Sequence, residues 1–378
     1  LNGLFPFISA TGVSAVIVLI GFLIAWLVWP LVARLGVPVA TRVRTAAVVT
    51  LALVVVGSGA LGLAGRTYDP APDGREITVA VVQGNVPGTG TSALGPRYTV
   101  ENNHLAQTIM LAAKIRTGQV AQPDFVLWPE NSTATDPFTD ATTAGVIEQA
   151  LDLVGVPILV GSIIAGPGPQ ERQTVGLWWT IEGQVEAEYA KRNLVPFGEW
   201  IPGRSWLVSM IPELTMVGAQ SVPGTRPGVL DVSVASGPLR VGDVICFEVS
   251  YDKTFDEMIL GDHSSGGGAQ IVTVQTSNAM FTGSDQMAQQ DQITRIRALE
   301  SRREILVATT NSLAGLIDSH GQIVYEARLR TADAQVFTVP TRSTVTWAVA
   351  ARLWFDLASV VLPLLGAAVV ATRRLVRH

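Results

Sequence analysis

Two long stretches without any charged side chain dominate the start of this chain. They run from Leu1 to Ala33 and from Thr45 to Gly65. Each meets the roughly 20 residues that a helix needs to cross the hydrocarbon core of a bilayer. A third stretch, Leu353–Ala371, carries a single acid, Asp356. We therefore predict three transmembrane helices. The first is not a signal peptide, because no basic residues precede it and its apolar run is too long.

The middle of the chain differs from these stretches in its polarity. Charged residues make up only 15% of the whole sequence, but their shortage is concentrated in the apolar stretches. Residues 73–340 have ordinary polarity and are numerous enough for one large domain. We predict two membrane helices with a short basic loop over residues 1–66, then this domain, then a membrane helix and a basic tail over residues 341–378. Because the chain begins with Leu, we also expect upstream residues, including further membrane helices.

Basic side chains predict the orientation. They gather in the link after the first apolar stretch and behind the third (Arg34, Arg42 and Arg44; Arg373, Arg374 and Arg377). Basic flanks favour the cytoplasmic side of a membrane. The central domain is therefore expected on the extracytoplasmic side of the cell membrane. The net charge of −5 argues against a nucleic-acid partner.

Apolar runs and helical segments alternate in the central domain, which predicts an α/β layered fold. Several of the runs are continuous, as in strands covered on both faces. The predicted strands are 77–83, 124–129, 157–163, 239–248, 270–276 and 304–310, with helices over 98–116, 142–154 and 285–303. Hairpins are expected to turn at Glu182-Gly183 and at 319–321.

The segment 200–217 is apolar, rich in proline and without a clear period. One interpretation is a buried loop. The other is a lid that contacts lipid. The lid interpretation assigns the contacts to four side chains: Trp200, Trp206, Leu207 and Met210.

Three predicted strand ends carry reactive side chains: Glu130, Lys191 and Cys246. Together these types suit covalent acyl transfer. A carboxylate can take the proton of a thiol, which makes the thiol a nucleophile. An ammonium group can then stabilise the oxyanion. Taken singly, each has an ordinary alternative: a helix cap, a solvated lysine and a small buried hydrophobe. A single cysteine excludes an internal disulfide.

The surrounding motifs resemble those of a known superfamily. WPE ends at Glu130, KRNLVPFGE runs from Lys191 to Glu199, and ICFE contains Cys246. In this order they are similar to the Glu-Lys-Cys motifs of the nitrilase, or carbon–nitrogen hydrolase, superfamily, which implies an α-β-β-α sandwich. With the flanking membrane helices, the longer motif to Pro202 resembles the bacterial apolipoprotein N-acyltransferase family. The segments RALESRR (297–303) and ATTNSLAGLID (308–318) extend this likeness.

This resemblance implies a two-step reaction. Cys246 would take a fatty acyl chain from a phospholipid as a thioester. The chain would then pass to the α-amino group of the diacylglyceryl-cysteine at the N-terminus of a lipoprotein. By motif position, Glu130 is the general base and Lys191 stabilises the oxyanion. No metal or diffusible cofactor is implied.

Further residues are assigned by the same motifs. Glu199 and Glu248 match acids that support the site, Phe247 stands at an aromatic position beside the nucleophile, and Trp128 is expected to pack by the pocket. Two other functions compete with the acyltransferase. One is a membrane-tethered amidase that hydrolyses small amides with the same triad. The other is a non-catalytic scaffold that keeps only the fold.

Overall fold

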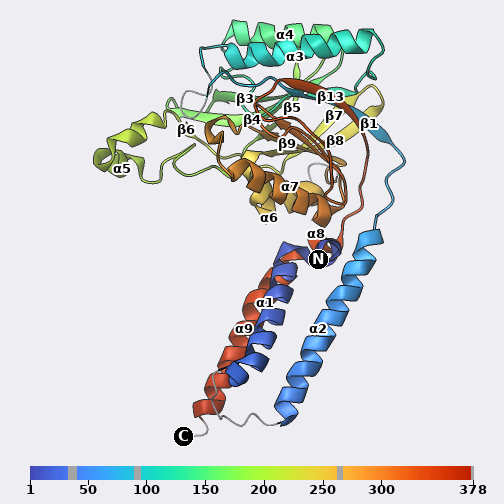
Figure 1. The fold of residues 1–378 in the computed structure, drawn as a ribbon. Helices are drawn as coiled ribbons and strands as arrows, with labels where there is room; N and C mark the ends of the chain where they lie inside the picture. Colours follow the sequence, from blue (N-terminus) through green and yellow to red (C-terminus); the bar gives the residue numbers. More distant parts are fainter. Residues whose placement is uncertain (33–40, 89–94, 262–266, 376–378) are drawn as a thin grey trace. The chain divides into compact units, whose positions relative to one another are not determined.

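The computed structural model describes residues 1–32, 41–88, 95–261 and 267–375, which form two compact units (Figure 1). The helical unit contains residues 1–70, 299–302 and 345–378, and the sandwich unit contains residues 71–298 and 303–344. The sequence analysis placed the domain boundaries at residues 66, 73 and 340, and these positions remain predictions. Arg34 and Arg377, used to predict the orientation, lie outside the described residues.

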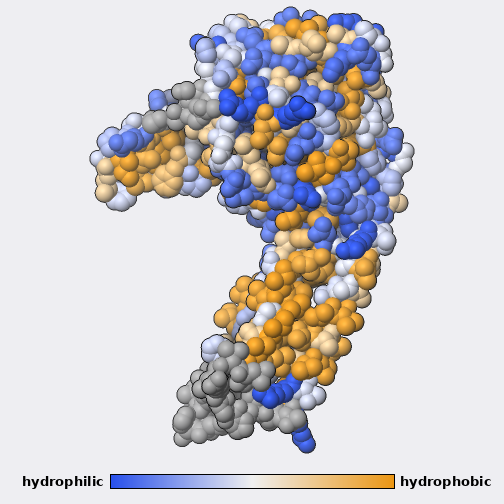
Figure 2. Space-filling view, viewed as in Figure 1, coloured by the Kyte–Doolittle hydropathy of each residue, from blue (hydrophilic) through white to orange (hydrophobic). Residues whose placement is uncertain are grey.

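Three long helices make up most of the helical unit: α1 (Phe5–Val32), α2 (Thr41–Thr67) and α9 (Arg352–Leu375). Three segments are long and apolar enough to cross a membrane: Asn2–Trp29, which joins η1 (Asn2–Leu4) to most of α1, Arg42–Thr67 in α2 and Arg352–Val369 in α9. Their large apolar side chains are exposed, as the orange surface in Figure 2 shows. In water this exposure would be unfavourable, so these helices are suited to lipid.

Close backbone packing and one buried ion pair hold the helical unit together. The short helix η1 (Asn2–Leu4) lies against α2, where a Cβ on Gly3 would overlap the Gly62 carbonyl. The helix α1 breaks at Ser9 (φ 58°), and the Ala10 N–H donates to Glu300 Oε1 over 2.7 Å. Glu300 is fully buried and also accepts two hydrogen bonds from the Arg352 guanidinium, at 2.9 and 3.0 Å. Another short helix, α8 (Trp347–Ala350), precedes α9.

The sandwich unit contains two sheets that face each other. The first has the strand order β13-β1-β2-β3-β4-β5, with β6 beside β4, and the second has the order β12-β11-β10-β9-β8-β7. The strands of the first sheet are β1 (Glu76–Gln83), β2 (Phe125–Leu127), β3 (Ile158–Ala165), β4 (Glu171–Trp179), β5 (Val185–Ala190), β6 (Gln220–Ser221) and β13 (Asp333–Pro340). Those of the second are β7 (Val229–Val234), β8 (Gly237–Ile245), β9 (Ile271–Thr276), β10 (Ile305–Thr309), β11 (Gly315–Ile317) and β12 (Ile323–Glu326).

Helices cover the outer faces of both sheets (Figure 1). The first sheet lies under α3 (Thr99–Arg116) and α4 (Ala141–Val154), and the second lies against α6 (Asp252–Leu260) and α7 (Gln286–Ser301). Alternate residues of β1 explain this layering, because Val79 and Val81 belong to the core between the sheets whereas Ala80 and Val82 belong to the core under the helices. Both faces are buried, so the run is continuously apolar. The predicted α-β-β-α sandwich is confirmed.

Several sequence predictions need correction. The strand expected over residues 239–248 ends at Ile245, and Cys246–Ser250 form the 3-10 helix η4. The strands β7 and β13 and the helix α6 were not predicted. The interpretation of 200–217 as a buried loop is wrong. This segment forms α5 (Arg204–Met210) and the 3-10 helix η3 (Pro212–Met216), and α5 has no buried residue.

Candidate active site

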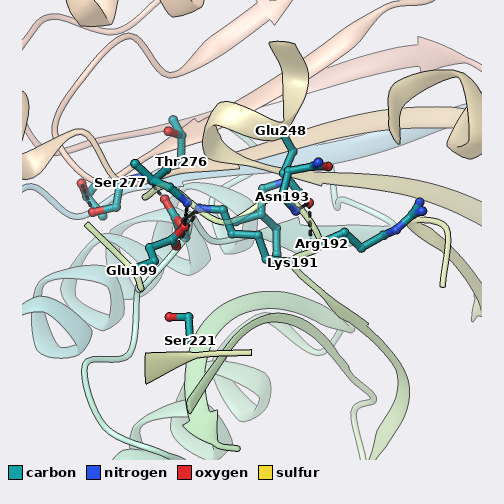
Figure 3. Close-up of polar contacts among 12 residues, drawn as sticks. Lys191, Arg192, Asn193, Glu199, Ser221, Glu248, Thr276 and Ser277 are labelled. Carbon is teal, nitrogen blue, oxygen red and sulfur yellow. Dashed lines mark hydrogen bonds and ion pairs between the residues drawn. The ribbon is translucent and has the colours of Figure 1, made fainter. Parts of the chain in front are cut away.

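A buried lysine between two carboxylates forms the centre of the candidate site. Lys191 Nζ donates to Glu130 Oε1 over 2.9 Å and to Glu199 Oε1 over 2.8 Å. Figure 3 shows its side chain extending toward Glu199. Lys191 is only 1% exposed and Glu130 only 4%. Because a buried charge is costly without partners, the three side chains require one another.

Three strand ends bring these groups together. Lys191 directly follows β5, and its N–H donates to Thr174 O of β4 over 2.9 Å. Glu130 follows β2 after a proline, and its backbone packs on β3, where a Cβ on Gly161 would overlap the Pro129 carbonyl. Cys246 follows β8. All three lie where loops leave a rigid sheet, which is a common place for functional residues.

The Cys246 thiol is held in a strained turn beside this ion cluster. Its φ of 58° lies in the left-handed region, which costs a non-glycine residue roughly 1–2 kcal/mol. The side chain is buried, and burial, together with the nearby Glu130 carboxylate, raises the pKa of the thiol to about 12. The Lys191 ammonium and a hydrogen bond with Thr276 act in the opposite direction. The resting sulfur is therefore a thiol and needs a base.

The lysine keeps its proton although it is buried. Burial alone lowers the pKa of Lys191, but Glu130, Cys246 and Glu199 outweigh that effect and raise the pKa well above its ordinary value. A permanently charged ammonium beside the thiol suits the stabilisation of a developing oxyanion.

Glu248 ties the turn of Cys246 to the loop that follows Lys191. Its Oε1 accepts the backbone N–H groups of Arg192 and Asn193 at 2.6 and 2.8 Å, as Figure 3 shows. Its Oε2 accepts the N–H of Ile245 at 3.0 Å, and the Tyr189 hydroxyl donates to the same carboxylate at 3.0 Å. Glu199 supports the other end of that loop, because its Oε2 accepts the Val195 N–H at 2.7 Å. Both acids therefore position backbone around the triad.

The end of β9 supplies three contacts that the sequence did not reveal. Gln275 Nε2 donates to Trp128 O over 2.6 Å, the Thr276 hydroxyl lowers the pKa of the neighbouring Cys246 thiol, and the Ser277 N–H donates to Glu130 Oε2 over 2.7 Å. Figure 3 shows Thr276 and Ser277 beside the ion cluster. The only signal was their place at the end of a predicted strand.

The remaining predicted residues are spread around the triad. The Trp128 side chain packs away from it, under α3, where its Nε1 donates to Thr108 Oγ1 over 3.1 Å. Phe247 is 39% exposed and meets Tyr251 edge-on at 5.9 Å. On α5, Trp206 and Met210 are 64% and 63% exposed and Leu207 is half-buried. Trp200, which precedes this helix, is also half-buried. Figure 2 shows the apolar patch at α5.

Comparison with known proteins identifies the family to which this chain belongs. A model of the carbon-nitrogen hydrolase family matches residues 78–349, which include all three members of the triad. The chain belongs to the carbon–nitrogen hydrolase family. Among the described residues, no group of three or more His, Cys, Asp or Glu side chains is arranged to hold a metal ion.

Relatives within this family are named for acyl transfer. The chain is 32% identical over 330 residues to the apolipoprotein N-acyltransferase of Mycolicibacterium smegmatis, covering 82% of this chain and 52% of that protein. It is 28% identical over 302 residues to the enzyme of the same name from Allorhizobium ampelinum, covering 77% of this chain and 54% of that protein. The chain thus spans about half the length of these curated relatives.

Solved structures of the superfamily share the fold. A mutant of the Nesterenkonia AN1 amidase, from the nitrilase superfamily, superimposes with a TM-score of 0.51 at 16% identity. The match covers 76% of this chain and 98% of the amidase. At this identity the likeness concerns the carbon–nitrogen hydrolase fold alone.

Proposed function

We propose that this protein is an apolipoprotein N-acyltransferase that uses Glu130, Lys191 and Cys246 in a two-step acyl relay. The observation that carries the proposal is the buried Lys191, bound to Glu130 and next to a protonated thiol. Its acyl donor is a phospholipid and its acceptor is the N-terminal diacylglyceryl-cysteine of a lipoprotein.

The first step forms a thioester. Glu130 accepts the thiol proton, and the sulfur attacks the ester carbonyl of the phospholipid. The Lys191 ammonium stabilises the oxyanion of the tetrahedral intermediate. When the intermediate collapses, the C–O bond breaks and the leaving lysophospholipid oxygen takes the proton from Glu130. The acyl chain remains on Cys246.

The second step uses the same groups in reverse order. The α-amino group of the acceptor attacks the thioester carbonyl, and Glu130 receives the proton that the amine loses. Lys191 again faces the oxyanion. The C–S bond then breaks, the amide is released, and Cys246 regains its proton from Glu130.

Two features favour lipid substrates over small amides. The chain has three helices long and apolar enough to cross a membrane, and a tethered enzyme meets membrane substrates at high effective concentration. The helix α5 exposes Trp206 and Met210, which suits contact with lipid. The basic residues Arg42 and Arg44 at the start of α2 support an extracytoplasmic sandwich unit, since basic flanks favour the cytoplasm.

Intact mass spectrometry tests the proposal directly. The protein is mixed with phospholipid micelles, and we expect one added acyl chain, released by hydroxylamine and absent in Cys246→Ser. Addition of a synthetic diacylglyceryl-cysteine lipopeptide should remove the adduct and yield a triacylated peptide.

Other results would contradict the proposal. Turnover of small amides with no transfer to the lipopeptide would favour the membrane-tethered amidase. A protein that forms no adduct and turns over neither substrate would be a scaffold.

A further inference from the structure

A carboxyl group outside the triad lies fully buried between the two sheets. Asp243, on β8, has no exposed surface. Its Oδ1 accepts a hydrogen bond from Thr273 Oγ1 over 3.1 Å, but no donor reaches its Oδ2 among the described residues. An unpaired carboxylate oxygen at such a place would be costly.

A second orphaned acceptor lies next to it. Gln275 Oε1, on β9, is also buried and has no donor in the described part of the chain. Both oxygens crowd the same point on the opposite sheet. A Cβ on Gly176 of β4 would overlap Asp243 Oδ2 and lie 2.8 Å from Gln275 Oε1. The orientation of the amide is fixed at its other end, because Gln275 Nε2 donates to Trp128 O at 2.6 Å.

Two acceptor oxygens that meet in a dry interior need a proton between them. We propose that Asp243 is a positioning residue whose neutral carboxyl group donates to Gln275 Oε1, so that Gln275 holds the Trp128 carbonyl and aligns the end of β9 with Glu130. This inference rests on the proposed function. Gly176 leaves room for the contact because it has no side chain.

The position of the end of β9 matters because this strand belongs to the second sheet, whereas Trp128 and Glu130, which it contacts, follow β2 of the first sheet. From Gln275 onward, consecutive residues of β9 and its loop contact the Trp128 carbonyl, the Cys246 thiol and the Glu130 carboxylate. Trp128 is two residues before Glu130. A slip of Gln275 would therefore move the base relative to the sulfur, and small displacements of reacting groups cost much rate.

The surroundings keep the Asp243 carboxyl group neutral. Burial, together with the nearby Glu248 and Glu130 carboxylates, raises the pKa of Asp243 to about 8, although Thr273 acts against this. Tyr189 of β5 is another titratable group near Asp243, and its pKa is itself raised by burial, by Glu248 and by Asp243. The pKa of Glu248 is also raised, so the pH dependence of the wild type alone does not identify the group that titrates. A variant at Asp243 isolates the effect of the Asp243 proton on the rate.

The test measures thioester formation by the intact protein with phospholipid micelles from pH 6 to 9.5. For the wild type we expect the rate to fall at least tenfold above about pH 8, as Asp243 ionises. Asp243→Asn keeps a donor toward Gln275, so its rate at pH 7 should stay within about threefold of the wild type and should not fall at high pH. Asp243→Leu removes the donor and should lose roughly 10- to 100-fold in rate, with KM for the phospholipid unchanged. Asp152→Asn, an exposed change on α4, should match the wild type.

Three results would overturn the inference: an identical alkaline fall in the wild type and Asp243→Asn, a fully active Asp243→Leu, or a fully active Gln275→Glu. If Asp243→Leu does not fold, the pH profile of Asp243→Asn and the rate of Gln275→Glu decide.

The pH dependence of unfolding separates this inference from the proposed function. The folded protein holds a proton that the unfolded chain releases near pH 4, so the wild type should lose stability between about pH 4 and 8. Glu248, whose pKa is also raised by burial, gives a slope of the same sign in both proteins. The slope of Asp243→Asn should therefore be smaller than that of the wild type by the contribution of one proton, whether or not thioester forms. Equal slopes would refute the neutral carboxyl group, whereas a wild type that forms no thioester would refute the proposed function alone.

Discussion

Replacing Glu248 by glutamine is the sharpest test of how the site is held. The carboxylate receives three backbone N–H groups, from Arg192, Asn193 and Ile245, and the hydroxyl of Tyr189. A glutamine has only one acceptor oxygen. If that oxygen replaces Oε1, the amide NH₂ faces the Ile245 N–H, so two donors meet in a buried place.

The cost follows from these hydrogen bonds. A buried donor without a partner costs about 1–3 kcal/mol, and the two bonds that remain lose their charge assistance, roughly 1 kcal/mol each. Burial raises the pKa of Glu248, which shows that the ionised group carries a desolvation penalty that glutamine lacks. This offsets part of the loss. We expect a net destabilisation of about 2–4 kcal/mol, which corresponds to a drop in melting midpoint of roughly 4–7 °C for a unit of this size.

Thermal unfolding in detergent, followed by tryptophan fluorescence, measures the stability, and the adduct assay measures thioester formation. The matched control is Glu182→Gln, an exposed change in the hairpin between β4 and β5, which should shift stability by no more than about 0.5 kcal/mol. We expect Glu248→Gln to slow thioester formation at least tenfold at a temperature where it is still folded, because Cys246 and Lys191 lose their common support.

Equal melting midpoints for Glu248→Gln and Glu182→Gln would refute this reasoning. So would a destabilised Glu248→Gln with a normal rate, since the carboxylate would then support the fold without positioning the triad.

Three further changes probe other parts of the site. Lys191→Met removes the ammonium group that Glu130 and Glu199 share. It should lower thioester formation roughly 10²–10³-fold, measured against the 82%-exposed control Lys253→Met; near-normal turnover would show that the lysine takes no part in the reaction. Gly161→Ala should cost about 1–3 kcal/mol in unfolding measurements and at least tenfold in rate, because its Cβ would lie 2.7 Å from the Glu130 Cα. The control Gly145→Ala meets open space on α4, and equal rates for these two alanines would disprove the constraint on Glu130. Trp206→Ser should slow acyl transfer from vesicles but not from a water-soluble short-chain ester; equal loss with both donors would contradict lipid contact by α5.

The sequence predicted the layered fold well where local pattern and burial agree. β1, β3, β9 and β10 are apolar runs covered on both faces, so their composition alone identifies them. β7 and β13 were missed, because β7 alternates buried and exposed residues and both are edge strands of their sheets. Edge strands bury fewer apolar side chains, so their sequences contain shorter apolar runs and are harder to identify as strands.

The end of β8 shows what local pattern cannot predict. The run through Ile245, Cys246 and Phe247 continues to favour a strand, yet the chain turns at Cys246 with a φ of 58°. The groups that stabilise this turn are distant in sequence, since the Glu248 carboxylate binds the loop after Lys191. The motifs therefore predicted which residues are reactive, but not Gln275, Ser277 or Asp243, whose contacts arise only when the two sheets pack.

The protonated state of Cys246 has a consequence for the survival of the protein. Oxidants and alkylating reagents attack the thiolate much faster than the thiol. A sulfur whose pKa is raised to about 12 by burial and by the Glu130 carboxylate is almost entirely thiol at neutral pH. With a single cysteine in this sequence, a sulfenic acid on Cys246 cannot be trapped as an internal disulfide, and its further oxidation to the sulfinic acid is irreversible. The resting protein thus keeps its single thiol unreactive until a substrate carbonyl binds beside it.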